Sequence, residues 1–331
     1  MYRATLIPGD GIGPEVTNAA IKVIEAAGID VQWETRYMGQ TALERFGTPL
    51  PEDTVKSIEN NKIALKGPVT TQMGGGFRSV NVSLRQQLNL YANIRPFKSF
   101  EGVKSKFDNV DLVVFRENTE DLYMGFEHMI GTDAAETIRL ITRHASERIA
   151  SFAFNYAVKE KRKKVTCVHK ANIMQLTDGL FLSSVRNIAK KYPDIEYEEM
   201  EAGYLCMKLV MNPERFDILV LPNLYGDLVS ELGAGLVGGL GVVAGANIGA
   251  EAAVYEATHG TAPDLIGKGI ANPTASILCG AMLLKRLGER DASNRIHNSV
   301  VKVLAEGKYT TPDLGGTAST EQMTKAIISN L

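Results

Sequence analysis

Short apolar runs alternate with longer stretches of mixed polarity along most of this chain. After a strand-like opening at residues 2–8, similar runs lie at residues 30–36, 62–66, 90–95, 110–115, 164–169 and 217–221. The stretches between them have helical character, and such alternation is typical of α/β proteins with a largely parallel sheet. We therefore predict an α/β fold.

Two segments depart from this alternation. Residues 123–142 contain short segments, 123–130 and 137–142, on either side of Gly131-Thr132-Asp133, which indicates a hairpin arm reaching to another subunit. Residues 232–250 carry no charge and are long enough to cross a bilayer, but seven of them are glycine. Because an interior glycine destabilises a helix by about 1 kcal/mol relative to alanine, we interpret this segment as a closely packed helix followed by a loop.

The apolar run at residues 216–231 is interrupted at Pro222 and Gly226 and then continues with Asp227 and Glu231. This pattern predicts a strand, a turn and a helix. The two acids are four residues apart and share a helix face, where like charges repel unless a cation lies between them. The sequence therefore indicates a metal site, and the alternative is a solvated first turn favoured by the helix dipole.

The composition is ordinary for a soluble protein of two domains: 331 residues, 44% apolar and 22% charged. A net charge of −2 and the lack of basic runs give no footprint for nucleic acid, and no membrane segment is expected, so partners should be small molecules or other subunits. Cys167, Cys206 and Cys279 lack the spacing of disulfide or zinc sites and indicate a reducing compartment. With no leader before residue 2, we expect a cytoplasmic protein.

A glycine run, Gly74–Gly76, leads into a predicted helix that contains Ser79, Asn81 and Arg85. Helix N-termini attract anions through free N–H groups and the helix dipole. Asn81 and Arg85 are four residues apart and share a face, and Ser79 lies in the first turn, where its hydroxyl can contact a bound carboxylate. A solvated amphipathic helix is the alternative.

Two more arginines end predicted strands: Arg95 follows Leu90–Ile94, and Arg116 follows Asp111–Phe115. In a parallel sheet such positions face the ligand crevice. With Arg85 they would form three converging guanidiniums, and each guanidinium can bind a carboxylate through two N–H groups. This set favours a substrate with two or three carboxylates over isolated surface ion pairs.

Tyr123 and Lys170 are the available proton carriers. To act near neutral pH either needs a lowered pKa, and we expect the neighbouring arginines to lower it. The alternatives are a half-buried tyrosine and a solvated lysine. His169 has no metal-ligand spacing and is interpreted as structural.

Two further glycine-containing segments have the character of loops. Residues 9–15 read Gly-Asp-Gly-Ile-Gly-Pro-Glu, but Pro14 stands where the dinucleotide fingerprint requires glycine. Residues 256–264, with Asn272 and Pro273, are rich in small residues and predict either a loop that lets a ligand approach the backbone or an ordinary turn.

Six ordered segments together resemble a known family. They are Gly9–Glu15, Arg78–Asn81, Phe115–Tyr123, His169–Met174, Asn223–Asp227 and His259–Asp264. The chain is similar over residues 3 to about 328 to the β-decarboxylating dehydrogenases, which comprise isocitrate, isopropylmalate and homoisocitrate dehydrogenases.

The resemblance implies the isocitrate/isopropylmalate dehydrogenase fold, with two α/β domains and a cofactor site that is not of the Rossmann type. Residues 1–98 plus 255–331 would form the large cofactor-binding domain, and residues 99–254 the small domain of a homodimer, with the arm at 123–142 as a clasp. The implied reaction oxidises a 2-hydroxy acid, transfers hydride to a nicotinamide, releases CO2 and reprotonates the enol, with a divalent cation polarising the oxygen.

The resemblance also implies roles for individual residues. Arg85, Arg95 and Arg116 would hold substrate carboxylates, Tyr123 would protonate the enol, and Lys170 of the partner subunit would take part in hydroxyl deprotonation. The cofactor would lie at Ile12, Thr71, Asn172, Glu256, His259, Gly260, Thr261, Ala262, Asp264 and Asn272. Mg2+ or Mn2+ would bind Asp227 and Glu231.

Three residues narrow the substrate and the cofactor within the family. Ser79 with Asn81 resembles the isocitrate pattern, since isopropylmalate enzymes place apolar residues on this helix. Asp264 resembles the NAD-dependent members, because a carboxylate accepts from a ribose 2′-hydroxyl and repels a 2′-phosphate. We therefore predict an NAD-dependent isocitrate dehydrogenase that forms 2-oxoglutarate and CO2.

Two positions depart from the family pattern. The first of three metal-binding aspartates, which the partner supplies, corresponds to Gly203, and the third corresponds to Glu231. Glu201 is a nearby carboxylate, but its offset of two residues points it to a different helix face. Gly203 leaves open a catalytically weakened regulatory subunit. A homoisocitrate or isopropylmalate dehydrogenase is the other alternative.

Overall fold

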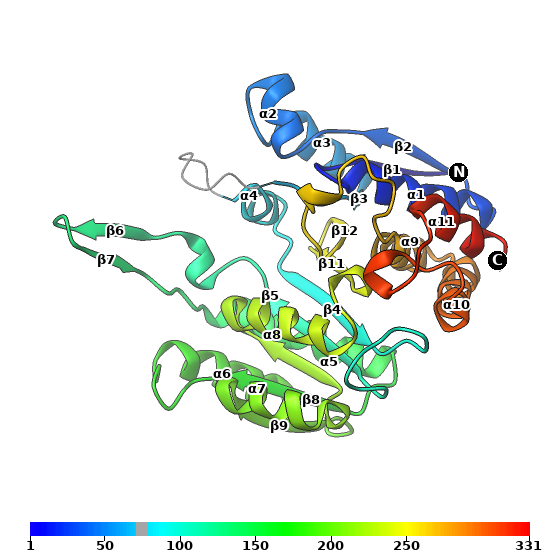
Figure 1. Ribbon diagram of the computed structural model, residues 1–331. Coiled ribbons are helices and arrows are strands. Elements are labelled where there is room, and N and C mark those ends of the chain that lie inside the picture. The colour runs from blue at the N-terminus through cyan, green and yellow to red at the C-terminus, as the bar shows by residue number, and fades with distance from the viewer. Residues whose placement is uncertain (71–78) are drawn as a thin grey trace.

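One mixed sheet runs through the molecule. The computed structural model describes residues 1–70 and 79–331, and within them ten strands pair in the order β2-β1-β3-β12-β11-β4-β5-β10-β8-β9 (Figure 1). They are β1 (Tyr2–Ile7), β2 (Val31–Thr35), β3 (Ile63–Lys66), β4 (Ala92–Lys98), β5 (Asp111–Glu117), β8 (Lys164–His169), β9 (Glu196–Glu201), β10 (Ile218–Leu221), β11 (Ala244–Ile248) and β12 (Ala253–Ala257). Each predicted strand is present, whereas β9, β11 and β12 were not predicted.

The sheet has two parallel wings. Strands β2, β1, β3 and β12 are parallel on one side, and β5, β10, β8 and β9 are parallel on the other. Between the wings, β11 pairs antiparallel with β12 and β4, and β4 pairs antiparallel with β5. The prediction of parallel pairing therefore holds in the wings and fails at the centre.

Helices accompany each wing (Figure 1). Beside the first wing and both termini lie α1 (Gly13–Ala26), α9 (Thr274–Leu287), α10 (Arg290–Glu306) and α11 (Thr320–Ile328), with α2 (Gln40–Phe46), α3 (Glu52–Asn61) and α4 (Val80–Gln87) at its other end. Beside the second wing lie α5 (Arg143–Lys159), α6 (Thr177–Ala189), α7 (Ala202–Met211) and α8 (Asn223–Leu236). The division into 1–98 plus 255–331 and 99–254 stays a prediction.

The core lies between the sheet and these helices. All four residues of β10 are buried, which explains its continuous apolar run. Phe97, Phe115 and Phe154 are at most 1% exposed, and burying a side chain of this size contributes about 1.5–3 kcal/mol. The three cysteines are free thiols, which agrees with the expected lack of disulfides.

The segment from Ile218 to Leu236 confirms the predicted strand, turn and helix. β10 ends at Leu221, Pro222 is the N-cap, and α8 begins at Asn223, so Gly226 lies inside the helix and not at its start. Beyond α8 the chain forms a short 3-10 turn, η3 (Leu240–Val242), and then β11.

The predicted helix followed by a loop is therefore present up to Val243, but the stretch at 232–250 then forms a strand that was not predicted. A Cβ at Gly245 would lie 3.0 Å from the carbonyl oxygen of Glu256, so the missing side chain lets β11 fit beside β12. Among the residues that the structure describes, no helix is long and apolar enough to cross a membrane.

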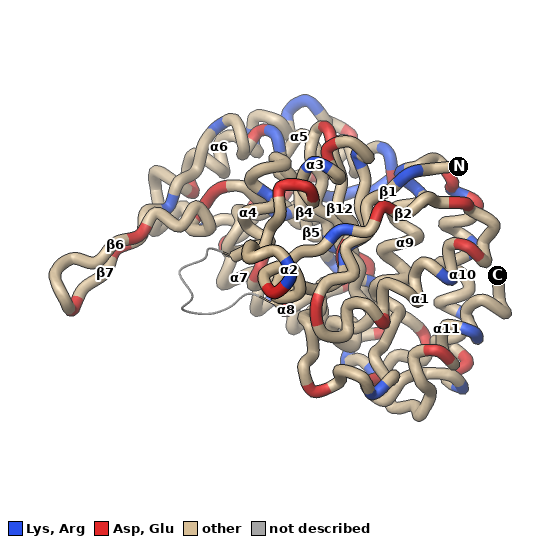
Figure 2. Tube along the Cα trace, turned by 90° about the horizontal axis from the view of Figure 1, so that it is seen from above, with Lys and Arg blue, Asp and Glu red and all other residues tan. Residues whose placement is uncertain are grey.

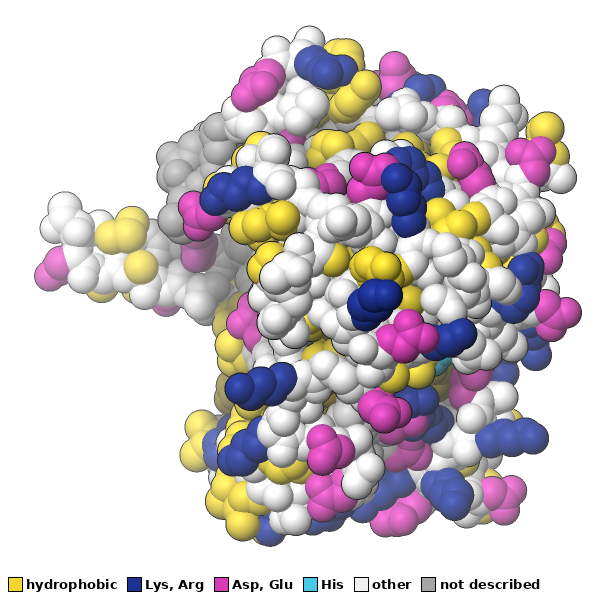
Figure 3. Space-filling model, turned by 45° about the vertical axis from the view of Figure 1, so that its right-hand side comes forward, with side chains coloured by type: hydrophobic (Ala, Val, Ile, Leu, Met, Phe, Trp, Pro, Cys, Tyr) yellow, Lys and Arg dark blue, Asp and Glu magenta, His cyan; other side chains and the backbone are white. Residues whose placement is uncertain are grey.

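The predicted arm is a two-stranded hairpin, β6 (Glu127–Ile130) and β7 (Ala134–Thr137), that projects away from the body (Figures 1 and 2). Every residue of both strands is exposed. Met129 and Ile130 are 59% and 52% exposed, and apolar side chains are visible on the projecting segment (Figure 3). Exposed apolar side chains on a projecting hairpin indicate a surface that a partner covers.

Candidate active site

Arg95 and Arg116 lie on the neighbouring strands β4 and β5 and contact Asp227 of α8. Nη1 of Arg116 forms an ion pair with Oδ1 of Asp227, and Nη1 of Arg95 lies 3.7 Å from the same oxygen. Nε of Arg116 donates to Oδ1 of Asn223 at 2.8 Å. Two guanidiniums therefore share one carboxylate of the helix that was predicted to bind metal.

The structure corrects the reason why these arginines meet. The sequence reasoning placed both at the ends of parallel strands, but β4 and β5 are antiparallel and Arg95 lies within β4. Arg116 is opposite Asn93 and Arg95 is opposite Val114. Directly opposed residues share a sheet face, and so do residues two apart on one strand, so Arg95 and Arg116 are diagonal neighbours on the same face. The antiparallel register, and not a common strand end, therefore brings the two guanidiniums together.

The third arginine comes from α4. Arg85 lies one turn after Asn81, and its Nη2 is 3.6 Å from Oε1 of Glu256 in β12. Ser79 is the N-cap of α4, and its side chain makes no capping hydrogen bond. The glycine run Gly74–Gly76 lies outside the described residues.

A cavity of about 170 Å3 lies where these elements meet, and its lining includes Asn81, Arg85, Asn93, Arg95 and Glu256. Four buried polar atoms of this cluster have no hydrogen-bond partner among the described residues: Oδ1 of Asn81, Nε of Arg85, Nε of Arg95 and Nη2 of Arg116. An unsatisfied buried polar group costs about 1–3 kcal/mol. Three guanidinium N–H groups are thus available to acceptor atoms of a ligand.

Tyr123, in the 3-10 turn η1 (Asp121–Met124), donates its hydroxyl to Oδ2 of Asp227, and the Arg116 guanidinium lies 4.9 Å from its ring centroid. Burial raises the pKa of Tyr123 to about 12, and the hydrogen bond to Asp227 acts in the same direction against the opposing effect of Arg116. The arginines act in the predicted direction, but burial and Asp227 outweigh them, so the prediction of a lowered pKa is wrong. Tyr123 keeps its proton near neutral pH and can serve as a proton donor.

Asp227 and Arg116 both keep their charges near neutral pH. Burial raises the pKa of Asp227, but Arg116 and the Tyr123 hydroxyl outweigh it, so this pKa lies below its ordinary value. Burial, with help from Arg85, lowers the pKa of Arg116 to about 10. The site therefore contains a stable carboxylate beside stable cations.

Asp227 and Glu231 lie one turn apart on α8, and Glu231 is exposed. Within residues 1–70 and 79–331, no group of three or more His, Cys, Asp or Glu side chains could hold a metal ion. Gly203 lies in the first turn of α7, where an added Cβ would meet nothing within 4 Å. One subunit thus supplies two carboxylates, which are the hard oxygen donors that Mg2+ and Mn2+ prefer, and further ligands must come from elsewhere.

Lys170 follows β8, and its Nζ pairs with Oε2 of Glu201 at 2.8 Å. Glu201 is the last residue of β9 and the N-cap of α7. Within the described residues, the ion pairs of Lys170 and those of Asp227 share no side chain. Within the described residues, no shared ion-pair partner therefore links Lys170 to the arginine cluster.

The two glycine-containing loops meet, although they are about 250 residues apart in the chain. The amide of Ile12 donates to the carbonyl of Thr261 at 3.0 Å, and Ile12 packs with Ala262 and Ala271. Gly11 has a φ of +62°, and a Cβ there would lie 2.1 Å from the carbonyl oxygen of Thr261. Only glycine permits this contact, so the missing dinucleotide fingerprint is replaced by close packing of two loops.

The other predicted cofactor residues are dispersed. Asp264 is exposed in the turn η4 (Pro263–Leu265), whereas His259 and Gly260 line the 170 Å3 cavity. Nε2 of His259 is buried without a hydrogen-bond partner among the described residues. His259 thus presents an unpaired ring nitrogen in the loop that contacts Ile12.

Asn272 and Asn172 are among the predicted cofactor residues that do not line this cavity. Asn272 uses both side-chain atoms internally, donating to Asp313 at 2.9 Å and accepting from the amide of Thr274 at 3.0 Å. Asn172 is exposed beyond β8, near Lys170 in sequence. Thr71 lies outside the described residues.

The sequence reasoning missed a polar network beside Glu256. Lys66 lies directly opposite Glu256 and pairs with it. Asn247 donates to Glu256 at 2.6 Å and accepts from Asn93 and Asn118 at 2.9 Å each. Burial opposes ionisation, but Lys66 lowers the pKa of Glu256 to about 2. A lysine that ends the buried run Ile-Ala-Leu was the signal that could have revealed this network.

Glu120, between β5 and η1, was also missed. Its carboxylate accepts from the amide and the hydroxyl of Thr142, both at 2.8 Å, and its carbonyl accepts from Asn223 at 2.9 Å. Burial raises the pKa of Glu120 to about 7, and Glu117 acts in the same direction. Glu120 thus connects α8 with the start of α5.

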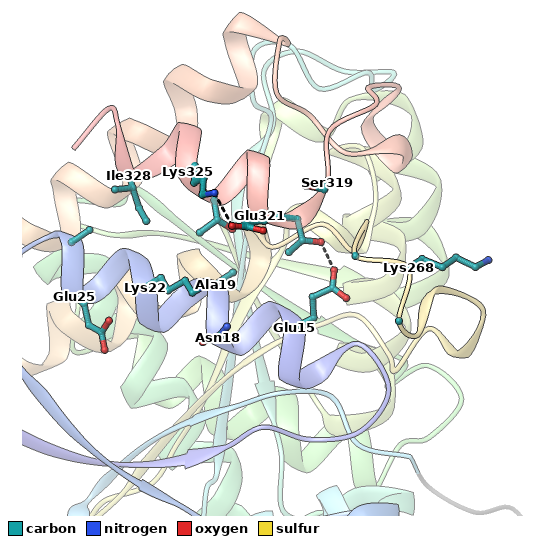
Figure 4. A pocket seen from close by; sticks show the side chains of 15 residues that line it. Glu15, Asn18, Ala19, Lys22, Glu25, Lys268, Ser319, Glu321, Lys325 and Ile328 are labelled. Carbon is teal, nitrogen blue, oxygen red and sulfur yellow. Dashed lines mark hydrogen bonds and ion pairs between the residues drawn. The ribbon is translucent and has the colours of Figure 1, made fainter.

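A second cavity, of about 830 Å3, lies between α1 and α11 (Figure 4). Two of its carboxylates have partners within the lining, Glu15 with the hydroxyl of Thr320 and Glu321 with Lys325 (Figure 4). In the part of the chain that the structure describes, no buried side-chain polar atom of its lining lacks a partner. Among the described residues, it therefore differs from the smaller cavity in having no buried unsatisfied polar atom.

Arg85 and Arg95 line one cavity, and Arg116 and Tyr123 share Asp227 with Arg95 on a helix that carries two carboxylates. Clustered cations, a protonated tyrosine and paired carboxylates are features of an α/β enzyme site that can bind an acidic substrate. The sequence narrows this class further. The chain belongs to the isocitrate/isopropylmalate dehydrogenase family, whose sequence profile matches residues 3–327.

Individual relatives support this membership. The crystal structure of isocitrate dehydrogenase from Methylococcus capsulatus is 56% identical, with a TM-score of 0.97 over 100% of this chain and 99% of that chain. The mitochondrial isocitrate dehydrogenase [NAD] catalytic subunit 5 of Arabidopsis thaliana is 50% identical over 99% of this chain and 88% of that protein. A mitochondrial isocitrate dehydrogenase [NAD] regulatory subunit from Dictyostelium discoideum is 47% identical over 100% of this chain and 92% of that protein. The predicted family and fold are confirmed.

The expectation of a cytoplasmic protein is contradicted. Both the Arabidopsis and the Dictyostelium relatives are described as mitochondrial. The expectation rested on a strand that begins at residue 2, and the position of a first strand carries no information about the compartment.

Proposed function

We propose that this protein is an NAD-dependent isocitrate dehydrogenase, which converts isocitrate to 2-oxoglutarate and CO2. The observation that carries the proposal is a cavity lined by the guanidiniums of Arg85 and Arg95, with Arg116 joined to Arg95 through Asp227, and each of the three arginines has a buried nitrogen without a partner among the described residues. Isocitrate has three carboxylates, and arginine N–H groups bind carboxylates in a bidentate manner. The names of the Methylococcus and Arabidopsis relatives support this substrate.

The helix α4 favours isocitrate within the family. Asn81 presents a buried oxygen without a partner, and Ser79 at the N-cap makes no capping hydrogen bond. The amide NH2 group of Asn81 and the hydroxyl of Ser79 can both donate to a carboxylate, whereas an isopropyl group offers them no acceptor. A substrate with a carboxylate at this position is therefore preferred over isopropylmalate.

The proton steps are assigned to two residues. Tyr123 retains its proton near neutral pH and would donate it to the enol carbon after CO2 leaves, while Asp227 orients its hydroxyl. Arg116 lies over the ring and would stabilise the phenolate that remains. Lys170 of a second subunit would take part in removing the substrate hydroxyl proton.

A divalent cation fits the helix α8. When bound, Mg2+ or Mn2+ would polarise the substrate oxygens as a Lewis acid. Asp227 and Glu231 would hold it, and the lowered pKa of Asp227 keeps this carboxylate ready for a cation. Because Gly203 has no side chain to bind the cation, Asp227 and Glu231 would supply most of the protein ligands of the cation.

The cofactor assignment rests on the loop that follows β12. His259 presents an unpaired ring nitrogen, and Asp264 is exposed nearby in the same loop. A carboxylate at Asp264 accepts from a ribose 2′-hydroxyl and repels a 2′-phosphate, so NAD is favoured over NADP.

Two exposed apolar surfaces support a homodimer. One is the hairpin β6-β7, and the other is the outer face of α7, where Tyr204, Met207 and Met211 are 49%, 45% and 57% exposed. On α7 they recur at helical spacing, and such a stripe indicates a protein interface. In a homodimer, the second copy would supply Lys170 to the arginine cluster of the first.

A regulatory subunit is the second candidate function. Gly203 favours it, because loss of one metal ligand or its support typically lowers affinity or activity about 10- to 100-fold. The Dictyostelium relative, which is 47% identical to this chain, is named a regulatory subunit. Homoisocitrate and isopropylmalate remain alternative substrates.

The test is a substrate panel with the purified protein. Isocitrate, homoisocitrate and isopropylmalate are each supplied with NAD or NADP over a series of Mn2+ concentrations, and the absorbance of the reduced cofactor is followed. We expect turnover with isocitrate, NAD and Mn2+. Turnover with another acid only would reject the substrate, and binding of isocitrate without turnover under any condition would favour the regulatory subunit.

A further inference from the structure

One buried arginine at the base of the arm joins two parts of the site. Arg139 follows β7, and its side chain is only 11% exposed. Nε donates to Oδ1 of Asp121 at 2.5 Å, and Nη1 pairs with Oδ1 of Asp178. Both aspartate side chains are 0% exposed. A single guanidinium therefore lies between two fully buried carboxylates that come from η1 and α6.

Asp178 fixes the segment that carries Lys170. Its second oxygen, Oδ2, accepts from the backbone amide of Lys170 at 2.6 Å. Nη1 of Arg139 also lies 3.0 Å from Sδ of Met174, in the turn between Lys170 and α6. The path of the chain after β8 thus depends on the aspartate that Arg139 holds.

Asp121 fixes the start of the helix that carries Asp227. Its Oδ2 accepts from the backbone amide of Leu224 at 2.9 Å, in the first turn of α8. Asp121 has a φ of 73°, a conformation that non-glycine residues adopt rarely, and it lies two residues before Tyr123. Both carboxylate oxygens of Asp121 have partners in this conformation, Arg139 on one and the amide of Leu224 on the other.

Tyr225 closes the network from α8. The guanidinium of Arg139 lies 5.0 Å from its ring centroid, and Nη1 lies 3.4 Å from its hydroxyl. Tyr225 neighbours Leu224 and is two residues before Asp227. Arg139 therefore contacts α8 directly as well as through Asp121.

We propose that Arg139 is a positioning residue, which locks the Lys170 segment and the Tyr123–Asp227 segment into one rigid unit. Removing Arg139 leaves two buried carboxylates without their shared cation, so both aspartates must move or become protonated. Because Lys170 serves the partner's site in the proposed function, Arg139 couples the two sites of a dimer. The inference rests on that function for its effect on catalysis, but not for its effect on structure.

The first experiment measures structure without substrate, metal or cofactor. Amide hydrogen exchange is compared by mass spectrometry in the wild type, Arg139→Met and Arg139→Lys, for the peptides that contain Lys170 and Leu224. We expect exchange in both peptides to become at least about 10-fold faster in Arg139→Met and to be partly restored in Arg139→Lys, because lysine keeps the charge but cannot form the same fork.

Arg162 provides a matched control. It also bridges two aspartates, Asp111 at 2.5 Å and Asp217 at 2.9 Å. Both lie at the N-terminal ends of β5 and β10, and Arg116 lies near the C-terminal end of β5. Arg162→Met should lower thermal stability without faster exchange at Lys170 or Leu224. If Arg139→Met leaves either peptide unchanged, or if Arg162→Met accelerates both equally, the proposal is wrong.

The second experiment measures catalysis in hybrid dimers. One protomer carries Lys170→Met and the other carries Tyr123→Phe, and the two are co-expressed with different tags, so that one working site forms in each hybrid. Arg139→Met is then added to one protomer or to the other. We expect kcat to fall about 10- to 100-fold in both placements, with KM for isocitrate changed less, and Arg139→Lys should recover part of the loss.

A fall in only one placement would contradict the coupling of the two segments. A wild-type protein that turns over no substrate would reject the proposed function instead, and the exchange measurement would still decide the role of Arg139. The two failures are therefore distinguishable.

Discussion

Gly226 on α8 leaves the space that the side chain of Arg116 occupies. A Cβ at this position would lie 2.5 Å from Cγ, 2.6 Å from Cβ and 3.1 Å from Cδ of Arg116. Carbon atoms in contact prefer about 3.5–4.0 Å, so in Gly226→Ala either the helix or the arginine must move by about 1 Å.

The magnitude follows from the partners of Arg116. Its side chain is 1% exposed, and it bonds Asn223 and Asp227. Overpacking typically costs about 1–3 kcal/mol, and a hydrogen bond to a charged group contributes about 1.5–3 kcal/mol. We expect Gly226→Ala to lose about 2–4 kcal/mol of unfolding free energy, and kcat/KM for isocitrate to fall about 100-fold, since a 1 Å misplacement can have that effect.

Gly235 on the same helix is the control. An added Cβ there would meet nothing within 4 Å, so Gly235→Ala should gain about 0.5–1 kcal/mol from helix propensity and keep its kinetics. Urea unfolding and steady-state kinetics measure both quantities. If Gly226→Ala behaves like Gly235→Ala, Arg116 does not need the space and the reasoning is refuted.

Three further changes have expected outcomes. Burial raises the pKa of Glu120 to about 7, so the folded state binds the proton of this carboxyl more tightly than the unfolded state does. This contribution to stability should be lost as the pH rises from about 4.5 to about 7. Glu120→Gln should therefore flatten this part of a plot of Tm against pH. Gly203→Asp fits the open space at the start of α7 and should tighten Mn2+ binding about 10- to 100-fold in a calorimetric titration if a second subunit brings this position to the metal; unchanged affinity would place it elsewhere. Asp227→Asn should weaken Mn2+ binding by at least about 10-fold, while thermal unfolding reports the separate loss of its ion pairs with Arg95 and Arg116.

Several features of the fold and the site were predictable from neighbouring residues. The strand and helix around Pro222 follow from an apolar run, a proline and a helical pattern, and the hairpin at 127–137 follows from short segments around Gly131. In both cases a few adjacent residues set the local backbone, so a short window of sequence carries the information.

Other features were predicted with the wrong reason or the wrong sign. The arginines at 95 and 116 do meet, but through an antiparallel pair and not at common strand ends. The pKa of Tyr123 rises because burial and Asp227 outweigh the arginines. Burial is set by everything packed around a side chain, and motif spacing does not report it.

The sequence by itself determined the α/β class, the family, most of the elements and the residue types of the site, because these depend on local pattern and ordered motifs. Only the tertiary structure decided that β11 separates β12 from β4, that Lys66 pairs with Glu256, and that Arg139 bridges Asp121 and Asp178. Each of these contacts joins residues that are not neighbours in the chain. Their energies depend on exclusion of water and on strand register, which exist only once the whole sheet has assembled.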